Sequence, residues 1–133
     1  MKKIEHIGIA VKDLEKSNEL FASLFGKSHY KIEEVASEGV KTSFFKSGPN
    51  KIELLEATKP DSPIAKFIEK KGEGIHHIAF AVDDIKSEIT RLKNKGFTVI
   101  NETPKKGADN KLVAFLHPKT TNGVLIELCQ EIE

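Results

Sequence analysis

Two histidines and two glutamates recur at matching positions in the two halves of the chain. His6 stands in the segment IEHIGIAV and His77 in the segment IHHIAFAV, 71 residues later (77 − 6 = 71). Glu53 stands in KIEL and Glu127 in LIEL, 74 residues later (127 − 53 = 74). Two imidazoles and two carboxylates form a mixed nitrogen and oxygen donor set that suits a divalent metal ion. Four such ligands in an octahedron leave two neighbouring positions open, as in catalytic rather than structural sites.

The repetition decides between two interpretations of these residues. A single histidine in a strand is more often a surface or structural residue than a metal ligand, and a strand glutamate is usually solvated. Here both residue types return at the same repeat position, each time on the inferred inner face. The sequence therefore predicts that the four residues converge on one metal ion.

The elements that must position them form two copies of one βαβββ unit, because four segments match in the same order. In the first copy we expect a strand at residues 4–11, a helix at 14–24 and strands at 30–35, 40–46 and 51–56. In the second copy we expect a strand at residues 75–82, a helix at 85–95 and strands at 98–101, 111–117 and 123–130. Asp13 and Asp84 stand at the helix starts, where a carboxylate accepts hydrogen bonds from free backbone N–H groups.

The domain organisation follows from this duplication. We predict one domain over residues 1–133, composed of a first module (about 1–58), a linking helix (about 62–72) and a second module (about 74–133). Each module alone is too small to enclose a site, so the two are expected to share one.

Strand alternation assigns the candidate ligands to faces. His6 is followed on its own face by Gly8 and Ala10, and His77 is followed by Ala79. Such small side chains leave room, as expected for a concave surface that holds a ligand rather than for a packed core.

The glutamates and their neighbours follow the same alternation. Glu53 and Glu127 stand between apolar residues and point away from the apolar face. Cys129 shares the face of Glu127, and we interpret it as a small buried hydrophobe rather than a nucleophile. His76 lies on the helix side of its strand and is interpreted as a structural or supporting residue. The matching position in the first copy is Glu5.

Composition excludes several classes of function. With 21 basic and 20 acidic side chains and a net charge of +1, the chain lacks the basic surface of a nucleic-acid-binding domain. Its single cysteine excludes an intrachain disulfide and favours a reducing compartment. No apolar run is long enough for a signal peptide or a membrane span. We therefore expect a cytoplasmic protein that binds neither nucleic acid nor membrane.

The whole chain resembles the vicinal oxygen chelate superfamily, which includes glyoxalase I, methylmalonyl-CoA epimerase, extradiol dioxygenases and antibiotic-resistance proteins. The resemblance is carried by IEHI at 4–7, KIELL at 51–55, IHHIA at 75–79 and VLIEL at 124–128. It implies the α+β glyoxalase/bleomycin resistance/dioxygenase fold, in which tandem βαβββ modules form a U-shaped open sheet around a metal. It also implies His6, Glu53, His77 and Glu127 as ligands of one divalent ion, with nickel or cobalt favoured and zinc as an alternative. It implies a homodimer as well, in a superfamily whose members form the metal cavity either within one chain or across two swapped chains. The length of the linking segment favours sites within one chain.

Two branches of the superfamily fit the sequence. The ligand set looks like that of short bacterial glyoxalase I, and Thr42 stands where some epimerases carry a second carboxylate. The primary prediction is therefore glyoxalase I, which converts the hemithioacetal of methylglyoxal and glutathione to S-lactoylglutathione. The alternative is methylmalonyl-CoA epimerase, because FLHPK at 115–119 and SPIAKF at 62–67 look more like that branch. The expected substrate is in either case a small anionic thiol derivative, a glutathione adduct or an acyl-CoA.

Both branches require removal of a proton from a carbon next to a carbonyl group. A divalent metal stabilises the resulting enolate as a Lewis acid, and a carboxylate beside it takes the proton. Our hypothesis gives Glu127 the role of base, displaced from or loosely bound to the metal in the complex, and makes Glu53, on the opposite face, a ligand or second base. Two other classes are disfavoured. A binding-only module needs no open metal positions, and in an extradiol oxygenase, with two histidines and one carboxylate on iron, Glu53 would crowd out oxygen.

Overall fold

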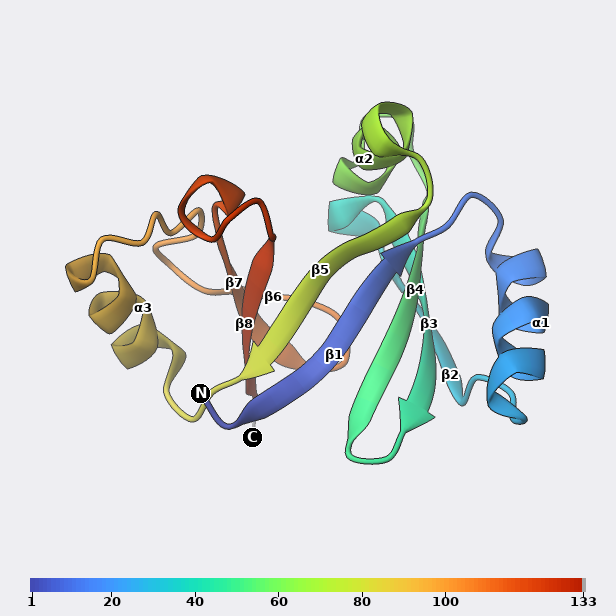
Figure 1. The fold of residues 1–133 in the computed structure, drawn as a ribbon, viewed down its shortest axis with the longest axis horizontal. Helices are drawn as coiled ribbons and strands as arrows, with labels where there is room; N and C mark the ends of the chain where they lie inside the picture. The colour runs from blue at the N-terminus through green and yellow to red at the C-terminus, as the bar shows by residue number, and fades with distance from the viewer. Residues whose placement is uncertain (133) are drawn as a thin grey trace. The chain divides into compact units, whose positions relative to one another are not determined.

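Two runs of the order βαβββ, joined by a helix, make up residues 1–132, the part of the chain that the computed structural model describes (Figure 1). The first run is β1 (Lys3–Ala10), α1 (Leu14–Phe25), β2 (Lys31–Val35), β3 (Val40–Ser47) and β4 (Asn50–Ala57). The joining helix is α2 (Pro63–Lys71). The second run is β5 (Gly74–Ala81), α3 (Ile85–Asn94), β6 (Lys105–Lys106), β7 (Lys111–Leu116) and β8 (Ile126–Glu131), and short 3-10 turns lie at Ala36–Glu38 and Pro118–Thr120. The predicted α+β class and its repeated unit are confirmed.

The helices begin and end at residues that favour those positions. Asp13 and Asp84 each accept a hydrogen bond from the backbone N–H three residues on, at 3.1 and 3.2 Å. Ser62 caps α2 in the same way at 3.1 Å. Helix α1 ends at Gly26, whose φ of 75° is a left-handed conformation that costs glycine no side-chain strain. Within the described residues, no helix is long and apolar enough to cross a membrane.

The chain forms two compact units. The first unit is Ile7–His76, and the second unit is Met1–His6 together with the chain from His77 onward. The division falls inside β1 and β5, so each of these strands contributes to both units. The modules predicted from the sequence have their boundaries between strands and helices, not inside them. Those boundaries stay a prediction.

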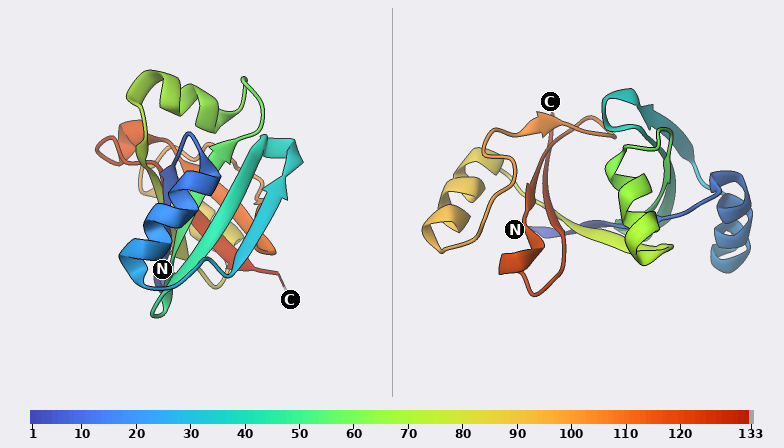
Figure 2. Two further views of the ribbon diagram at one scale, coloured as in Figure 1. Left: turned by 90° about the vertical axis from the view of Figure 1, so that its right-hand side faces the viewer. Right: turned by 90° about the horizontal axis from the view of Figure 1, so that it is seen from above.

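In the first unit, β2 pairs with β3 and β3 with β4, both antiparallel. Helix α1 covers one face of these strands (Figure 2), where Val11, Leu14, Phe45 and Leu54 form a buried cluster. Burying a side chain of this kind contributes about 1.5–3 kcal/mol. The opposite face packs Leu55 against Ile64 of α2. Successive residues of β4 therefore point alternately to the face covered by α1 and to the opposite face, as predicted.

In the second unit, β8 lies between β5, to which it is parallel, and β7, to which it is antiparallel. Helix α3 packs its apolar stripe on one face of this sheet, in a buried cluster of Val82, Ile85, Ile89, Leu92, Ala114, Leu116 and Leu128. The other face carries Ala79, Val113 and Cys129, with Phe115 packed beside them. Cys129 is thus a small buried residue of the face that also carries Glu127, as predicted.

Two predicted strands of the second run are placed differently. No strand forms at 98–101, where only an isolated bridge joins Val99 to Leu116. Beyond this bridge, the backbone N–H of Phe115 donates to the side-chain oxygen of Asn101 at 2.9 Å, where a continuing ladder would use a backbone carbonyl. The short strand β6 lies further along the chain. Strand β8 begins at Ile126 rather than at 123, because the preceding residues form a turn in which Gly123 has a φ of 84°.

Candidate metal centre

Three of the four predicted ligands meet in the second unit. The Nε2 atoms of His6 and His77 lie 3.0 Å apart. Oε1 of Glu127 lies 2.9 Å from His77 Nε2 and 3.5 Å from His6 Nε2. All three side chains are buried, with residue exposures of 5 %, 5 % and 7 %. The ligand atoms therefore face one another in a small space shielded from solvent.

Strand register explains how residues so far apart in sequence reach this place. Glu127 on β8 stands opposite Ala79 on β5 and opposite Phe115 on β7. Residues directly opposite one another share a face of the sheet, so Glu127 points away from α3. His77 lies two residues before Ala79 and shares that face. The ring of Phe115 packs edge to face against His77 at 5.9 Å, which restricts the imidazole.

The spacing and chemistry of these donors fit a divalent ion. Two ligand atoms at neighbouring octahedral positions, each about 2.1 Å from the ion, lie about 3.0 Å apart. The observed separations of 3.0, 2.9 and 3.5 Å are close to that value. Two imidazole lone pairs and a carboxylate aimed at one another also repel unless a proton or a cation lies between them. Several divalent metals accept such a set of two nitrogens and one oxygen, so the set itself selects no single metal.

Opposing effects act on the pKa of Glu127. Burial raises the pKa, because the ionised carboxylate loses its hydration. The rings of His6 and His77, 3.5 and 2.9 Å from Oε1, lower the pKa of Glu127 through hydrogen bonding and electrostatic attraction, and together these effects outweigh burial, so the pKa lies well below its ordinary value. The carboxylate is therefore ionised at neutral pH, which is the form that both a metal ligand and a proton acceptor require.

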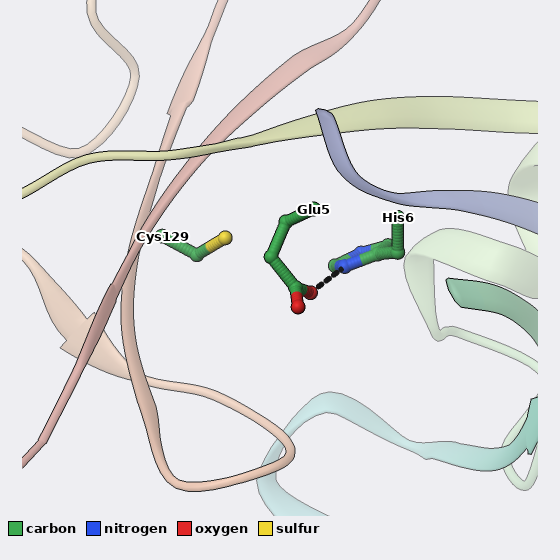
Figure 3. A group of neighbouring side chains, drawn as sticks. All are labelled: Glu5, His6 and Cys129. Atoms are coloured by element: carbon green, nitrogen blue, oxygen red, sulfur yellow. Dashed lines mark hydrogen bonds and ion pairs between the residues drawn. The ribbon is translucent and has the colours of Figure 1, made fainter. Parts of the chain in front are cut away.

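A fourth buried side chain, Glu5, supports this group and was not identified as a site residue from the sequence. Its Oε1 lies 2.7 Å from Nδ1 of His6, on the opposite side of the imidazole from Nε2 (Figure 3). Alternation describes the direction of Cβ and places Glu5 on the opposite face from His6. The flexible glutamate side chain brings its carboxylate back to the adjacent ring. In the sequence, the signal for this contact is that Glu5 stands directly before the candidate ligand His6.

Cys129 lies on the far side of the same carboxylate. Its Sγ and the ligand atoms of Glu5 and His6 all lie within 4.8 Å of one another. The thiol donates to the backbone oxygen of Phe80 at 3.5 Å, and the residue is 2 % exposed. Figure 3 shows the sulfur directed toward Glu5 from β8. Packing among apolar neighbours agrees with the interpretation of Cys129 as a buried hydrophobe.

The fourth predicted ligand, Glu53, belongs to the first unit. It is 5 % exposed on β4 and stands opposite Phe44 of β3, while Thr42 stands opposite Leu55 on the same face. This face is the one that α1 does not cover, as alternation predicts. The role of Glu53 as a metal ligand stays a prediction.

The remaining histidines lie outside this group. His76 packs its ring edge to face on Phe67 of α2 at 4.9 Å, a structural role in the first unit. His29 packs on Phe45 at 5.9 Å. Nδ1 of His117 accepts the backbone N–H of Lys119 at 3.0 Å and caps a 3-10 turn. None of these contacts involves a candidate ligand.

Residues 5–115 match the family model described as the glyoxalase/bleomycin resistance protein/dioxygenase superfamily. The matched range contains His6, Glu53 and His77.

Named relatives match over almost the whole chain. An ethylmalonyl-CoA/methylmalonyl-CoA epimerase of Cereibacter sphaeroides is 41 % identical over 96 % of this chain and 97 % of its own length. A mitochondrial methylmalonyl-CoA epimerase of Homo sapiens is 40 % identical over 96 % of this chain and 73 % of its own. A solved structure of a Streptomyces coelicolor methylmalonyl-CoA epimerase variant, in complex with 2-nitronate-propionyl-CoA, is 34 % identical with a TM-score of 0.95. It covers 100 % of this chain and 99 % of its own.

Proposed function

The chain belongs to the glyoxalase/bleomycin resistance protein/dioxygenase superfamily, and we propose that within it the chain is a methylmalonyl-CoA epimerase. The observation that carries the proposal is the match to the Cereibacter sphaeroides epimerase along nearly the full length of both chains. The primary prediction from the sequence, glyoxalase I, is not supported, because the relatives named above are epimerases. The alternative from the sequence is therefore preferred. The substrate of this proposed activity is an acyl-CoA and not a glutathione adduct.

The reaction inverts one carbon without net change in composition. C2 of methylmalonyl-CoA lies between a thioester carbonyl and a carboxylate. Its C–H bond breaks, the proton passes to a base, and the electron pair delocalises onto the thioester oxygen. A proton returned to the opposite face of C2 gives the other epimer. No oxidant or reductant is needed, so the protein has to supply only an acid, a base and stabilisation of the developing negative charge.

His6, His77 and Glu127 are the residues that would hold the divalent ion. When bound, the ion supplies a Lewis acid that stabilises the negative charge on a substrate oxygen. We propose cobalt or nickel as the ion, and zinc is compared with them in the solvent-exchange assay below. We also propose that the protein forms a homodimer, as the resemblance implies.

The two buried glutamates supply the proton-transfer groups in this proposal. Glu127 is ionised at neutral pH, which is the form of a carboxylate that accepts a proton. Epimerisation also requires an acid on the other face of C2. Thr42 has no carboxylate to offer, so we assign that role to Glu53, which is buried on the face of β4 that α1 does not cover.

A solvent-exchange assay tests the function. The metal-free protein is loaded in turn with cobalt, nickel and zinc and incubated in D₂O with methylmalonyl-CoA. We expect both interconversion of the epimers and incorporation of one deuterium at C2, detected by mass spectrometry. Parallel samples receive methylglyoxal and glutathione. Turnover of this second pair, with no exchange into methylmalonyl-CoA at full metal loading, would restore the glyoxalase I interpretation and contradict the proposal.

A further inference from the structure

The contact between Glu5 and His6 determines which nitrogen of the imidazole carries hydrogen. A glutamate carboxylate can only accept hydrogen bonds, so at 2.7 Å it requires a hydrogen on Nδ1 of His6. In a neutral imidazole the lone pair is then on Nε2. That atom faces His77 Nε2 at 3.0 Å and Glu127 Oε1 at 3.5 Å. The tautomer selected by Glu5 is therefore the one that directs a free lone pair toward the other two candidate ligands.

The location of Glu5 also favours a role at the site. The residue is 5 % exposed, and burying a carboxylate costs free energy unless hydrogen bonds and charges compensate. The carboxylate lies between the imidazole of His6 and the sulfur of Cys129 (Figure 3). Leucine or valine would fill the same space without that cost if packing alone were required.

We propose that Glu5 is a positioning residue of the metal centre. It holds the proton on Nδ1 of His6, fixes the orientation of the ring and thereby prepares Nε2 to bind the ion. Carboxylates that support metal-binding histidines in this way act through the ligand and do not contact substrate. The inference rests on the metal-binding role of His6 in the proposed function, but it does not depend on which substrate is turned over.

The test is metal affinity, measured by competition with a chromophoric chelator for the wild type, Glu5→Leu and Glu5→Gln. Loss of a supporting carboxylate typically lowers metal affinity about 10- to 100-fold, which is the loss expected for Glu5→Leu. Glu5→Gln keeps an oxygen that accepts from Nδ1–H, so it should recover part of that loss. Circular dichroism of the metal-free proteins shows whether each variant is folded, and the glutamine variant serves if the leucine variant is not.

A spectroscopic readout separates positioning from general stability. Nitrogen-15 spectra of the imidazoles, with the His6 signals assigned by their loss in His6→Asn, report the tautomer directly. We expect Nδ1 of wild-type His6 to be protonated both in the metal-free protein and with zinc bound. In metal-free Glu5→Leu we expect a mixture of tautomers.

Cys129→Ala is the matched control, because it removes another buried neighbour of the carboxylate and leaves the Glu5–His6 contact in place. Its metal affinity should stay within about twofold of the wild type. Equal affinities of wild type and Glu5→Leu, or an equal loss in Cys129→Ala, would overturn the inference. A wild type that binds no divalent metal would overturn both the inference and the proposed metal site. Normal metal binding with the expected Glu5 effects, but no epimerisation, would overturn only the proposed function.

Discussion

His6 and His77 are 71 residues apart in the chain, yet their Nε2 atoms lie 3.0 Å apart. Their rings meet edge to face, with centroids 5.1 Å apart and an interplanar angle of 86°. This arrangement aims two nitrogens at one point, whereas stacked rings would place them side by side. Together with Glu127 Oε1, 2.9 Å from His77 Nε2, the pair defines the place where we expect the metal ion.

Replacing His77 by alanine should abolish tight metal binding. The variant loses one of three close donors and leaves Glu127 without its nearest hydrogen-bonding partner. We expect at least about a 100-fold loss of metal affinity, measured by chelator competition, and loss of epimerase activity.

The adjacent His76 provides a matched control for that variant. His76 packs on Phe67 and lies outside the group of candidate ligands. His76→Ala should keep wild-type metal affinity and lose about 1 kcal/mol of unfolding free energy from the aromatic contact. Equal metal affinities in His77→Ala and wild type would show that the pair of histidines does not form the site.

An ion pair on α3 predicts an acid-dependent change in stability. Arg91 Nε lies 2.5 Å from Oε1 of Glu88, and this hydrogen bond is the largest cause of a Glu88 pKa below the ordinary value of 4.5. A lowered pKa in the folded state means that the contribution is present above about pH 4.5 and is lost as the pH falls further. The contribution should be below about 1 kcal/mol, because Arg91 is half exposed.

Glu88→Gln removes this contribution together with the 3.3 Å contact between Glu88 Oε2 and the N-terminal ammonium of Met1, and it is compared with the wild type in urea unfolding between pH 3 and pH 7. The wild type should be the more stable protein at pH 7, and the difference should shrink as the pH falls below about 4.5. A difference that grows on acidification would contradict the assignment. High salt should reduce the difference at pH 7, since exposed ion pairs are screened.

The duplication explains why much of the fold and part of the site could be predicted. His6 and His77 are each the fourth residue of an eight-residue strand, and alternation then assigns their faces. Glu127 follows from the same rule on β8. These predictions depend only on local backbone geometry, which sequence periodicity reports directly.

Contacts made by flexible or polar side chains could not be predicted in this way. Glu5 reaches His6 through side-chain torsions that alternation does not describe. Asn101 replaces a strand ladder bond with its own side-chain oxygen, which a propensity for strand cannot reveal. The pattern of candidate ligands also does not distinguish glyoxalase I from epimerase, because both activities use the same metal chemistry.

Ser43 should be replaceable with a gain in stability. Its hydroxyl is fully buried on β3 and its Oγ makes no hydrogen bond within the described structure. An unsatisfied buried hydroxyl costs about 1–3 kcal/mol, so Ser43→Ala should raise the free energy of unfolding by about 1 kcal/mol. Urea denaturation with an unchanged m-value would measure this. Ser47→Ala, at an exposed position of the same strand, is the control and should change stability by less than about 0.5 kcal/mol.

The two proposed proton-transfer groups can be separated by stereochemistry. If Glu53 and Glu127 serve opposite faces of C2, Glu127→Gln and Glu53→Gln should each lose epimerisation by about 100-fold or more. Each variant should still exchange the C2 proton of one epimer with D₂O, because one base remains. The epimer that exchanges should differ between the two variants. Deuterium incorporation into each separately prepared epimer, at confirmed metal occupancy, provides the measurement. Loss of exchange from the same epimer in both variants, or full epimerisation by Glu53→Gln, would remove Glu53 from the proposed mechanism.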